Sequence, residues 1–136
     1  LEIGKAIEAV EGTDAYIISC GSNLYECLMA AKAIKDKYGA SVGILDVHTI
    51  KPFDSEAVIR VAEKTGNIVT VEDHSINGGL GGACAEVLLE AGYKGNFARV
   101  GMPDEFAVLG SVDDIYHYYK MDRDGIEEKL KVMLKL

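Results

Sequence analysis

Residues 72–82 have the sequence Glu-Asp-His-Ser-Ile-Asn-Gly-Gly-Leu-Gly-Gly, and this stretch indicates the fold class. An apolar run over residues 68–71 precedes it, and from Leu80 onward the apolar residues recur with helical spacing. The pattern therefore predicts a strand, a charged turn, a glycine-rich bend and a helix. In an open parallel sheet, such a loop lies beyond the carboxyl end of a strand, where ligands usually bind. Its glycines permit a tight reversal and the close approach of another surface.

The same alternation of strand and helix continues along the chain. Short apolar runs without clean alternation are typical of strands covered on both faces, and they occur at residues 15–20, 42–47, 67–71 and 97–100. Helices are expected between and after them, with first turns marked by the N-cap candidates Asn23, Asp54, Ser111 and Asp124. The first helix is expected to bury the stripe Leu24, Leu28, Ala31 and Tyr38.

This order of elements predicts an α/β fold, a three-layer sandwich with a mostly parallel sheet of about five strands. A further edge strand within residues 4–10 is the less favoured interpretation of that segment. The chain has 136 residues, of which 49% are apolar, so a single domain over residues 1–136 is expected.

Charge and cysteine usage exclude several classes of partner. The formal net charge of -8 argues against nucleic acid and against an anionic membrane surface, because both attract Lys and Arg. No apolar run approaches the roughly 18 to 20 residues that span a bilayer, and no secretory signal is visible. Three cysteines without a Cys-x-x-Cys spacing fit a reducing cytoplasm, which is the expected location. Because the first residue is Leu1 rather than methionine, a fragment or a processed product is expected.

The only cluster of acids and a histidine on a glycine-rich loop is Glu72, Asp73 and His74. An acid beside a histidine is typical of general bases and of metal ligands. Adjacent residues on a turn point in different directions, however, and neither His48 nor His117 has a matching spacing, so no metal site is expected. Two interpretations remain for His74, namely a place at an active-site rim or domain interface and a hydrogen bond that anchors the loop.

A phosphate could bind Gly78–Gly82 at the start of a helix, where backbone N–H groups attract anions. The spacing of neither a dinucleotide fingerprint nor a P-loop is present, and the upstream acids would repel a phosphate. Tight reversal and close packing are the favoured interpretation. His48 ends the second predicted strand, which is a functional position in such folds, although a lone histidine is more often structural. Cys84 lies on an apolar helical stripe, which favours a core position over a nucleophile.

Five segments in order along the chain resemble one protein family. The central segment is Val71-Glu72-Asp73-His74 with Gly78-Gly79-Leu80-Gly81, and the others are Gly4–Ala6, Ile17–Ser22, Asp46–Asp54 and Arg99–Phe106 followed by Gly110-Ser111. Together they resemble the C-terminal domain of transketolase-type thiamine diphosphate enzymes. The Gly-Gly-Leu-Gly element alone would be a weak signal, whereas the ordered set covers nearly the whole chain.

The resemblance implies the third of three domains in a homodimeric enzyme. In that family, thiamine diphosphate and Mg²⁺ lie between the first two domains, and the cofactor-binding motif and activating glutamate belong to those domains. Neither appears in this sequence, so no catalytic, cofactor-binding or metal-binding residue is expected here, and the isolated chain is expected to be inactive. The candidates for an interface or active-site rim toward the cofactor-binding domains or subunit are Glu72, Asp73, His74, Gly78, Gly79, Gly81 and His48.

The implied reaction is transfer of a two-carbon ketol unit between sugar phosphates. The pattern Pro103-Asp104-x-Phe106 with Gly110-Ser111 is similar to transketolase and to deoxyxylulose-phosphate synthase, and less similar to the β subunit of 2-oxoacid dehydrogenases. Two alternatives of other classes remain. One is a free-standing nucleotide-binding module that uses the glycine-rich bend, and the other is a purely structural oligomerisation domain.

Overall fold

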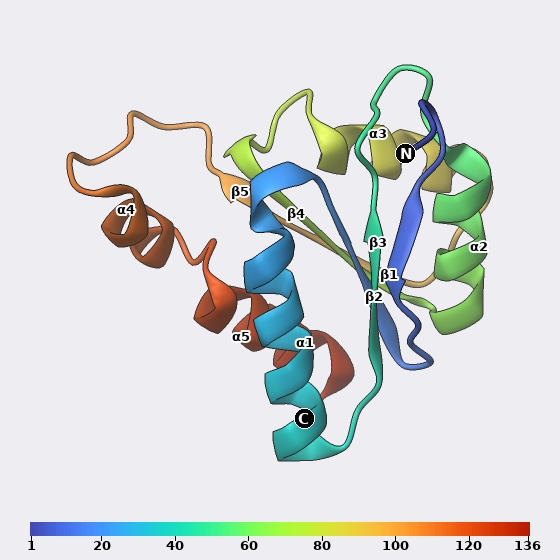
Figure 1. Ribbon diagram of the computed structural model, residues 1–136, viewed down its shortest axis with the longest axis horizontal. Coiled ribbons are helices and arrows are strands. Elements are labelled where there is room, and N and C mark those ends of the chain that lie inside the picture. The colour runs from blue at the N-terminus through green and yellow to red at the C-terminus, as the bar shows by residue number, and fades with distance from the viewer.

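The computed structural model describes residues 1–136 as one five-stranded sheet with helices on both faces (Figure 1). The elements in chain order are β1 (Ile7–Val10), β2 (Ala15–Ser19), the 3₁₀ turn η1 (Gly21–Asn23), α1 (Leu24–Tyr38), β3 (Val42–Asp46), α2 (Ser55–Thr65), β4 (Asn67–Ser75), α3 (Leu80–Glu90), β5 (Asn96–Met102), α4 (Val112–Tyr118) and α5 (Arg123–Leu134). The strand order is β1-β3-β2-β4-β5, and only β1 is antiparallel to its neighbour. The predicted α/β sandwich with a mostly parallel sheet is confirmed.

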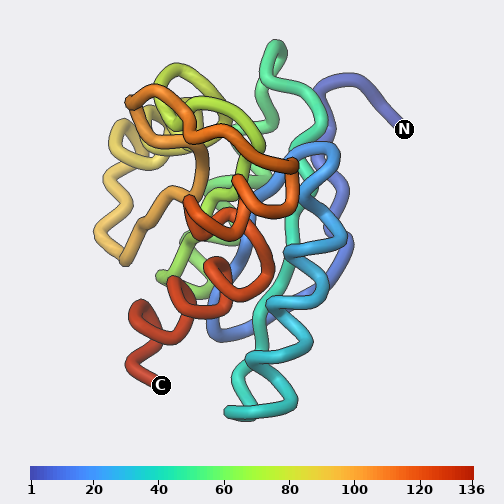
Figure 2. The backbone as a smooth tube through the Cα atoms, turned by 90° about the vertical axis from the view of Figure 1, so that its left-hand side faces the viewer, coloured from blue at the N-terminus to red at the C-terminus, as the bar shows by residue number.

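Two layers of helices bury the sheet. One core joins α1 and α5 to one face through residues such as Ile17, Ile44 and Val69, and the other joins α2 and α3 to the opposite face through Tyr16 and Ile68. Figure 2 shows α1 and α5 running side by side on their face. Because successive strand residues point to opposite faces, burial on both faces requires the continuous apolar runs seen in the sequence.

The strand before the glycine-rich bend is longer than predicted. The expected strand stops at Val71, whereas β4 runs to Ser75. Its last residues still pair with β5, where Ser75 aligns with Met102 after a register shift. Glu72, Asp73 and His74 therefore belong to a strand end rather than to a free turn, and their side chains alternate in direction.

Two of the predicted helix caps are confirmed. Asp54 accepts a hydrogen bond from Ala57 N at 3.2 Å at the start of α2, and Ser111 accepts one from Asp114 N at 3.2 Å at the start of α4. Each side chain satisfies a first-turn amide that has no partner within its helix.

The other two caps are corrections. Asn23 makes no capping bond, because η1 leads directly into α1 and Asn23 already has helical dihedrals. Asp122, rather than Asp124, caps α5, since its side chain accepts from Gly125 N at 3.1 Å. Asp122 has the extended backbone that an N-cap requires, whereas Asp124 lies within the helix.

Two further expectations are also corrected. The buried stripe of α1 consists of Cys27, Ala30, Ala31 and Ile34, so only Ala31 of the expected stripe is buried, and Tyr38 is exposed. The segment before β2 forms the edge strand β1, which was the less favoured interpretation.

None of the helices has both the length and the apolar character needed to cross a membrane.

Candidate functional site

The site lies at the carboxyl edge of the sheet, where the chain leaves two adjacent parallel strands in opposite directions. β2 continues into α1 on one face, and β4 continues into α3 on the other (Figure 1). Such divergence opens a crevice between the loops, and ligands of α/β proteins commonly bind there. One contact crosses it here, because Ser22 Oγ after β2 donates to Asp73 Oδ2 of β4 at 2.5 Å.

Glu72 is completely buried and holds the start of α3. Its Oε1 accepts from Leu80 N at 3.0 Å, and its Oε2 accepts from Gly81 N at 2.8 Å. These amides have no partner within the helix, and a carboxylate complements the positive end of the helix dipole. Glu72 was expected at an interface or rim. Its side chain has no exposed surface in this chain and its contacts are internal, so a place at an interface or rim stays a prediction.

The glycines allow this carboxylate to lie against the helix start. A Cβ atom on Gly79 would lie 2.0 Å from Glu72 Oε1, and one on Gly81 would lie 2.8 Å from Thr70 Oγ1. Gly78 has a φ of +74°, a left-handed conformation that side chains disfavour. The close approach expected at these glycines is therefore made within the chain, between α3 and β4. A contact of Gly78, Gly79 or Gly81 with another domain stays a prediction.

His74 and Asp73 point outward from this anchored loop. His74 Nδ1 lies 3.1 Å from Glu72 Oε1, while 56% of its side chain is exposed. Its Nε2 makes no hydrogen bond within the chain, so the buried carboxylate orients the ring and leaves one nitrogen for an external partner. Asp73 is exposed beside it. The contact of Nδ1 with Glu72 thus supports a loop-anchoring role for His74. The unbonded Nε2 leaves a role at a rim or interface open.

His48 lies at the same edge but outside this network. It follows β3, which β2 separates from β4, and no hydrogen bond joins it to Glu72, Asp73 or His74. Its Nδ1 lies 2.8 Å from Thr49 Oγ1, and its buried Nε2 has no partner.

Sequence reasoning missed a set of buried polar groups near His48. The unpartnered atoms there are Ser19 Oγ, Asn23 Nδ2 and Asp46 Oδ1. Ser19 and Asp46 are register partners at the ends of β2 and β3, and Asn23 precedes α1. Buried polar groups are nearly always hydrogen-bonded, so these atoms are unusual within the described structure. The available signal was a polar residue ending each of two apolar strands.

Comparison with known proteins agrees with this architecture. Residues 4–126 match the family model described as "Transketolase, C-terminal domain". The chain belongs to the transketolase C-terminal domain family. Its solved relatives include a split gene transketolase described as an inactive β4 tetramer, with a TM-score of 0.91 and 32% identity over 100% of this chain and 44% of that chain. The transketolase from Leishmania mexicana, with a TM-score of 0.69 and 18% identity over 97% of this chain and 18% of that chain, shows the fold alone.

Among curated relatives, one subunit of an apulose-4-phosphate transketolase from Phocaeicola vulgatus is 40% identical over 91% of this chain and 39% of its own length. A putative transketolase C-terminal section from Methanocaldococcus jannaschii is 39% identical over 98% of this chain and 41% of its own length. A 1-deoxy-D-xylulose-5-phosphate synthase from Chlorobium phaeovibrioides is 36% identical over 97% of this chain and 21% of its own length. The chain therefore spans about two-fifths of the first two relatives and one-fifth of the third.

The residues of this transketolase C-terminal domain do not fit the diphosphate of the family cofactor. Its one glycine-rich helix start is α3, whose first amides already bind the Glu72 carboxylate. A diphosphate placed there would have to displace a buried anion. No step of the family reaction is therefore assigned to this loop.

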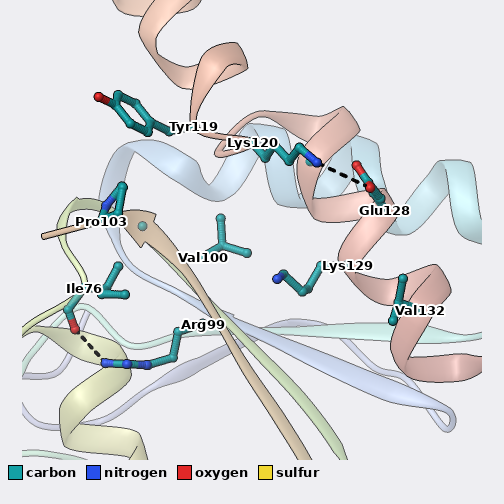
Figure 3. A pocket seen from close by; sticks show the side chains of 11 residues that line it. Ile76, Arg99, Val100, Pro103, Tyr119, Lys120, Glu128, Lys129 and Val132 are labelled. Carbon is teal, nitrogen blue, oxygen red and sulfur yellow. Dashed lines mark hydrogen bonds and ion pairs between the residues drawn. The ribbon is translucent and has the colours of Figure 1, made fainter. Parts of the chain in front are cut away.

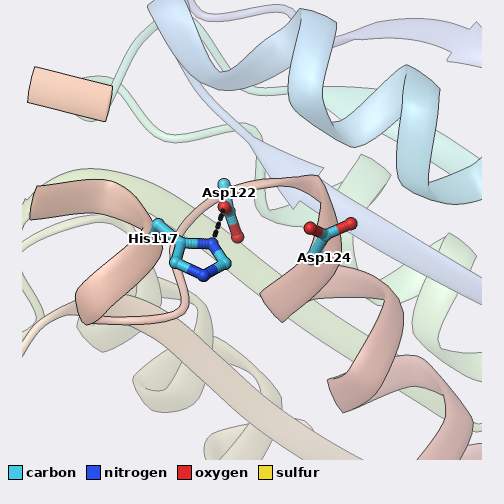
Figure 4. Close-up of side chains that lie close together, drawn as sticks. All are labelled: His117, Asp122 and Asp124. Carbon is cyan, nitrogen blue, oxygen red and sulfur yellow. Dashed lines mark hydrogen bonds and ion pairs between the residues drawn. The ribbon is translucent and has the colours of Figure 1, made fainter. Parts of the chain in front are cut away.

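One group resembles a metal site in composition. His117, Asp122 and Asp124 bring ligand atoms within 4.8 Å of one another, although the sequence spacing did not predict this. Figure 4 shows the three side chains lying near one another. Both carboxylate oxygens of Asp122 already have partners, since Oδ2 lies 2.8 Å from His117 Nδ1 and Oδ1 caps Gly125 N. The hydrogen bond that the His117 ring donates to the Asp122 carboxylate also raises the pKa of His117, which favours an ion pair over metal ligation. The helix cap accounts for the arrangement.

The transketolase C-terminal domain has no activated thiol. Burial raises the pKa of Cys84 to about 12 and that of Cys27 to about 12, and burial with nearby acids raises the pKa of Cys20 to about 11. Because the thiolate is the nucleophile, these side chains are inert at neutral pH. The predicted core position of Cys84 is confirmed.

Proposed function

We propose that residues 1–136 act as a single transketolase C-terminal domain. It supports assembly and active-site shape in an enzyme that uses thiamine diphosphate and Mg²⁺ to transfer a two-carbon ketol unit between sugar phosphates. Its partner is the cofactor-binding part of the same enzyme, as separate domains or as a subunit, and the complete enzyme is a homodimer. The observation that carries this proposal is the anchored loop at the carboxyl edge, which presents His74 and Asp73 outward while Glu72 occupies the anion site of α3.

Exposed apolar side chains beside this edge support a macromolecular partner. The segment after β5 projects from the sheet (Figure 1). Its Phe106 and Leu109 side chains are completely exposed. Large apolar side chains gathered at one exposed place typically mark a contact surface. Two relatives are themselves named as a transketolase subunit and a transketolase C-terminal section, which fits a chain that completes a larger enzyme.

The second candidate is the same role in a deoxyxylulose-phosphate synthase. Several synthases among the relatives favour it, including the one at 36% identity. Assays of the assembled enzyme for ketol transfer and for formation of 1-deoxy-D-xylulose 5-phosphate distinguish the two. A free-standing nucleotide-binding module is disfavoured, because the helix start that it requires already carries a carboxylate.

The isolated chain is expected neither to bind thiamine diphosphate tightly nor to turn over sugar phosphates. The reason is the occupied anion site at α3, and the measurement is isothermal calorimetry with the cofactor and Mg²⁺. NAD and ATP serve as parallel titrations for the nucleotide-binding alternative. A dissociation constant near 1 μM for thiamine diphosphate, about -8 kcal/mol, would place a cofactor site within these residues and contradict the proposal.

His74→Ala is expected to change the stability of the isolated chain by less than about 1 kcal/mol, because the side chain is more than half exposed. The same change is expected to lower assembly or turnover of the complete enzyme. His117→Ala is the matched control, since it removes another exposed histidine that contacts a carboxylate. Loss of several kcal/mol in the isolated chain, together with normal activity per assembled enzyme, would make His74 structural and refute its place at an interface.

A further inference from the structure

The outer edge of β5 is open and forms the floor of a groove. β5 pairs only with β4, so the other side of its backbone has N–H and C=O groups without a strand partner. Two cavities follow this edge, one of about 340 Å³ beside Arg99–Gly101 and one of about 370 Å³ beside Asn96–Ala98. Both are also lined by Lys129 and Val132 of α5. The two cavities therefore lie next to each other along the strand, and together they are called here the β5–α5 groove.

The groove collects positive charge on an acidic chain. Arg99, Lys120, Lys129 and Lys135 line it, and the only acid there is Glu128. Lys129 and Lys135 form no ion pair, and Arg99 donates to the carbonyl of Ile76 at 2.9 Å rather than to an acid. The groove lining thus contains four of the 14 Lys and Arg residues but only one of the 22 Asp and Glu residues, although the net charge of the chain is -8.

The cations lie on both sides of the strand. Figure 3 shows the Arg99 side chain on one side of the β5 ribbon and Lys129 on the other, and it shows Lys120, from the segment before α5, paired with Glu128 of α5. A second copy of β5 placed against this edge would bring the same cations together, and basic edge residues are a known barrier to such self-pairing. These cations would instead attract a negatively charged segment.

We propose that the β5–α5 groove binds an extended acidic segment of a partner protein, which adds a strand to β5. Backbone hydrogen bonds to the open edge supply affinity, and carboxylates on the segment meet Lys129, Lys135 and Arg99. An extended occupant fits better than a small anion, because a small anion would use one cavity whereas the groove follows the whole strand. Val132, which is 74% exposed, offers apolar contact for alternate side chains of the segment. The inference does not depend on the proposed function.

The test uses the chain of 136 residues labelled with ¹⁵N and a peptide of alternating Glu and Val as the probe. Saturable binding is expected, with amide shifts concentrated in β5 and α5 and affinity that falls as salt is added. The double variant Lys129→Glu with Lys135→Glu is expected to weaken binding by at least about tenfold. Lys5→Glu with Lys51→Glu makes the same charge change at exposed lysines outside the groove, and is expected to leave binding unchanged.

Two further peptides separate strand addition from charge alone. A peptide of alternating Glu and Pro keeps the charge but lacks half of the backbone donors, and is expected to bind at least about tenfold more weakly. A peptide of alternating Lys and Val is expected not to bind. Equal affinity for the Glu-Pro peptide, or shifts outside β5 and α5, would overturn the proposal.

Two other occupants give distinct results, and each would also overturn it. Saturable binding of inorganic phosphate that the groove variant abolishes, without peptide binding, would identify a small-anion site. Dimerisation of the chain in gel filtration that the same variant abolishes would identify a second copy as the occupant.

Discussion

Replacing Glu72 with alanine is expected to lower the free energy of unfolding by about 3 kcal/mol, because the change strips a buried helix start of its only acceptor. Two amides, those of Leu80 and Gly81, lose their partners at a place that water does not reach. Glu72→Gln is expected to cost less, about 1 to 2 kcal/mol, since its single carbonyl oxygen still accepts from one amide. Urea denaturation followed by circular dichroism measures both.

Asp73→Ala is the control for this prediction. Asp73 is the next residue, but its carboxylate is exposed and accepts only from the Ser22 hydroxyl. Its loss is expected to cost less than about 1 kcal/mol, as exposed contacts typically do. Equal destabilisation by Glu72→Ala and Asp73→Ala would show that the buried cap contributes no more than a surface contact.

Glu72 also connects the fold to the proposed interface. The same Oε1 atom that accepts from Leu80 N lies 3.1 Å from His74 Nδ1. Helix start and histidine ring are thus positioned by one carboxylate, so a defect in the cap also disturbs the residue that we place at the rim. Glu72→Gln is therefore expected to lower the activity of the assembled enzyme more than its effect on stability alone would predict.

The sequence predicted the parallel strands well for a physical reason. Strands covered on both faces must be apolar throughout, so β2, β3 and the first half of β4 are visible as continuous runs. β1 gave little signal, because it is an edge strand with mostly exposed side chains whose partner β3 lies far along the chain. The caps Asp54 and Ser111 are the residues directly before the helices they cap. Asp122 and Asp124 compete for one position, and only the backbone conformation decides between them.

The candidate site was predicted in place but not in detail. Sequence located the loop correctly, yet a charged residue after an apolar strand has the same pattern whether it is exposed or buried. The burial of Glu72 depends on amides that return from eight and nine residues later, which is a tertiary contact. The unpartnered groups at Ser19 and Asp46 likewise come together only through the pairing of β2 with β3.

Adjacent glycines at the start of α3 are expected to respond to substitution with opposite sign. Gly81→Val is expected to destabilise the chain by about 1 to 3 kcal/mol, because an added Cβ would lie 2.8 Å from Thr70 Oγ1 and 3.0 Å from Glu72 Oε2. Thr70 is fully buried and Glu72 is held by two amides, so neither side chain moves away without losing contacts.

Gly82 is the matched position, since it lies one residue later in the same helix and an added Cβ would meet no atom within 4 Å. Gly82→Ala is expected to stabilise the chain by about 0.5 to 1 kcal/mol, the usual gain when alanine replaces an unconstrained helical glycine. Gly81→Ala introduces the same side chain as Gly82→Ala, so the two variants differ only in position. Gly81→Ala is expected to destabilise the chain. Thermal unfolding of the variants compares them directly. If both alanine variants gained stability, α3 would not pack against β4 and Glu72 as closely as the structure places it, and the anchored loop that carries His74 would lose its physical basis.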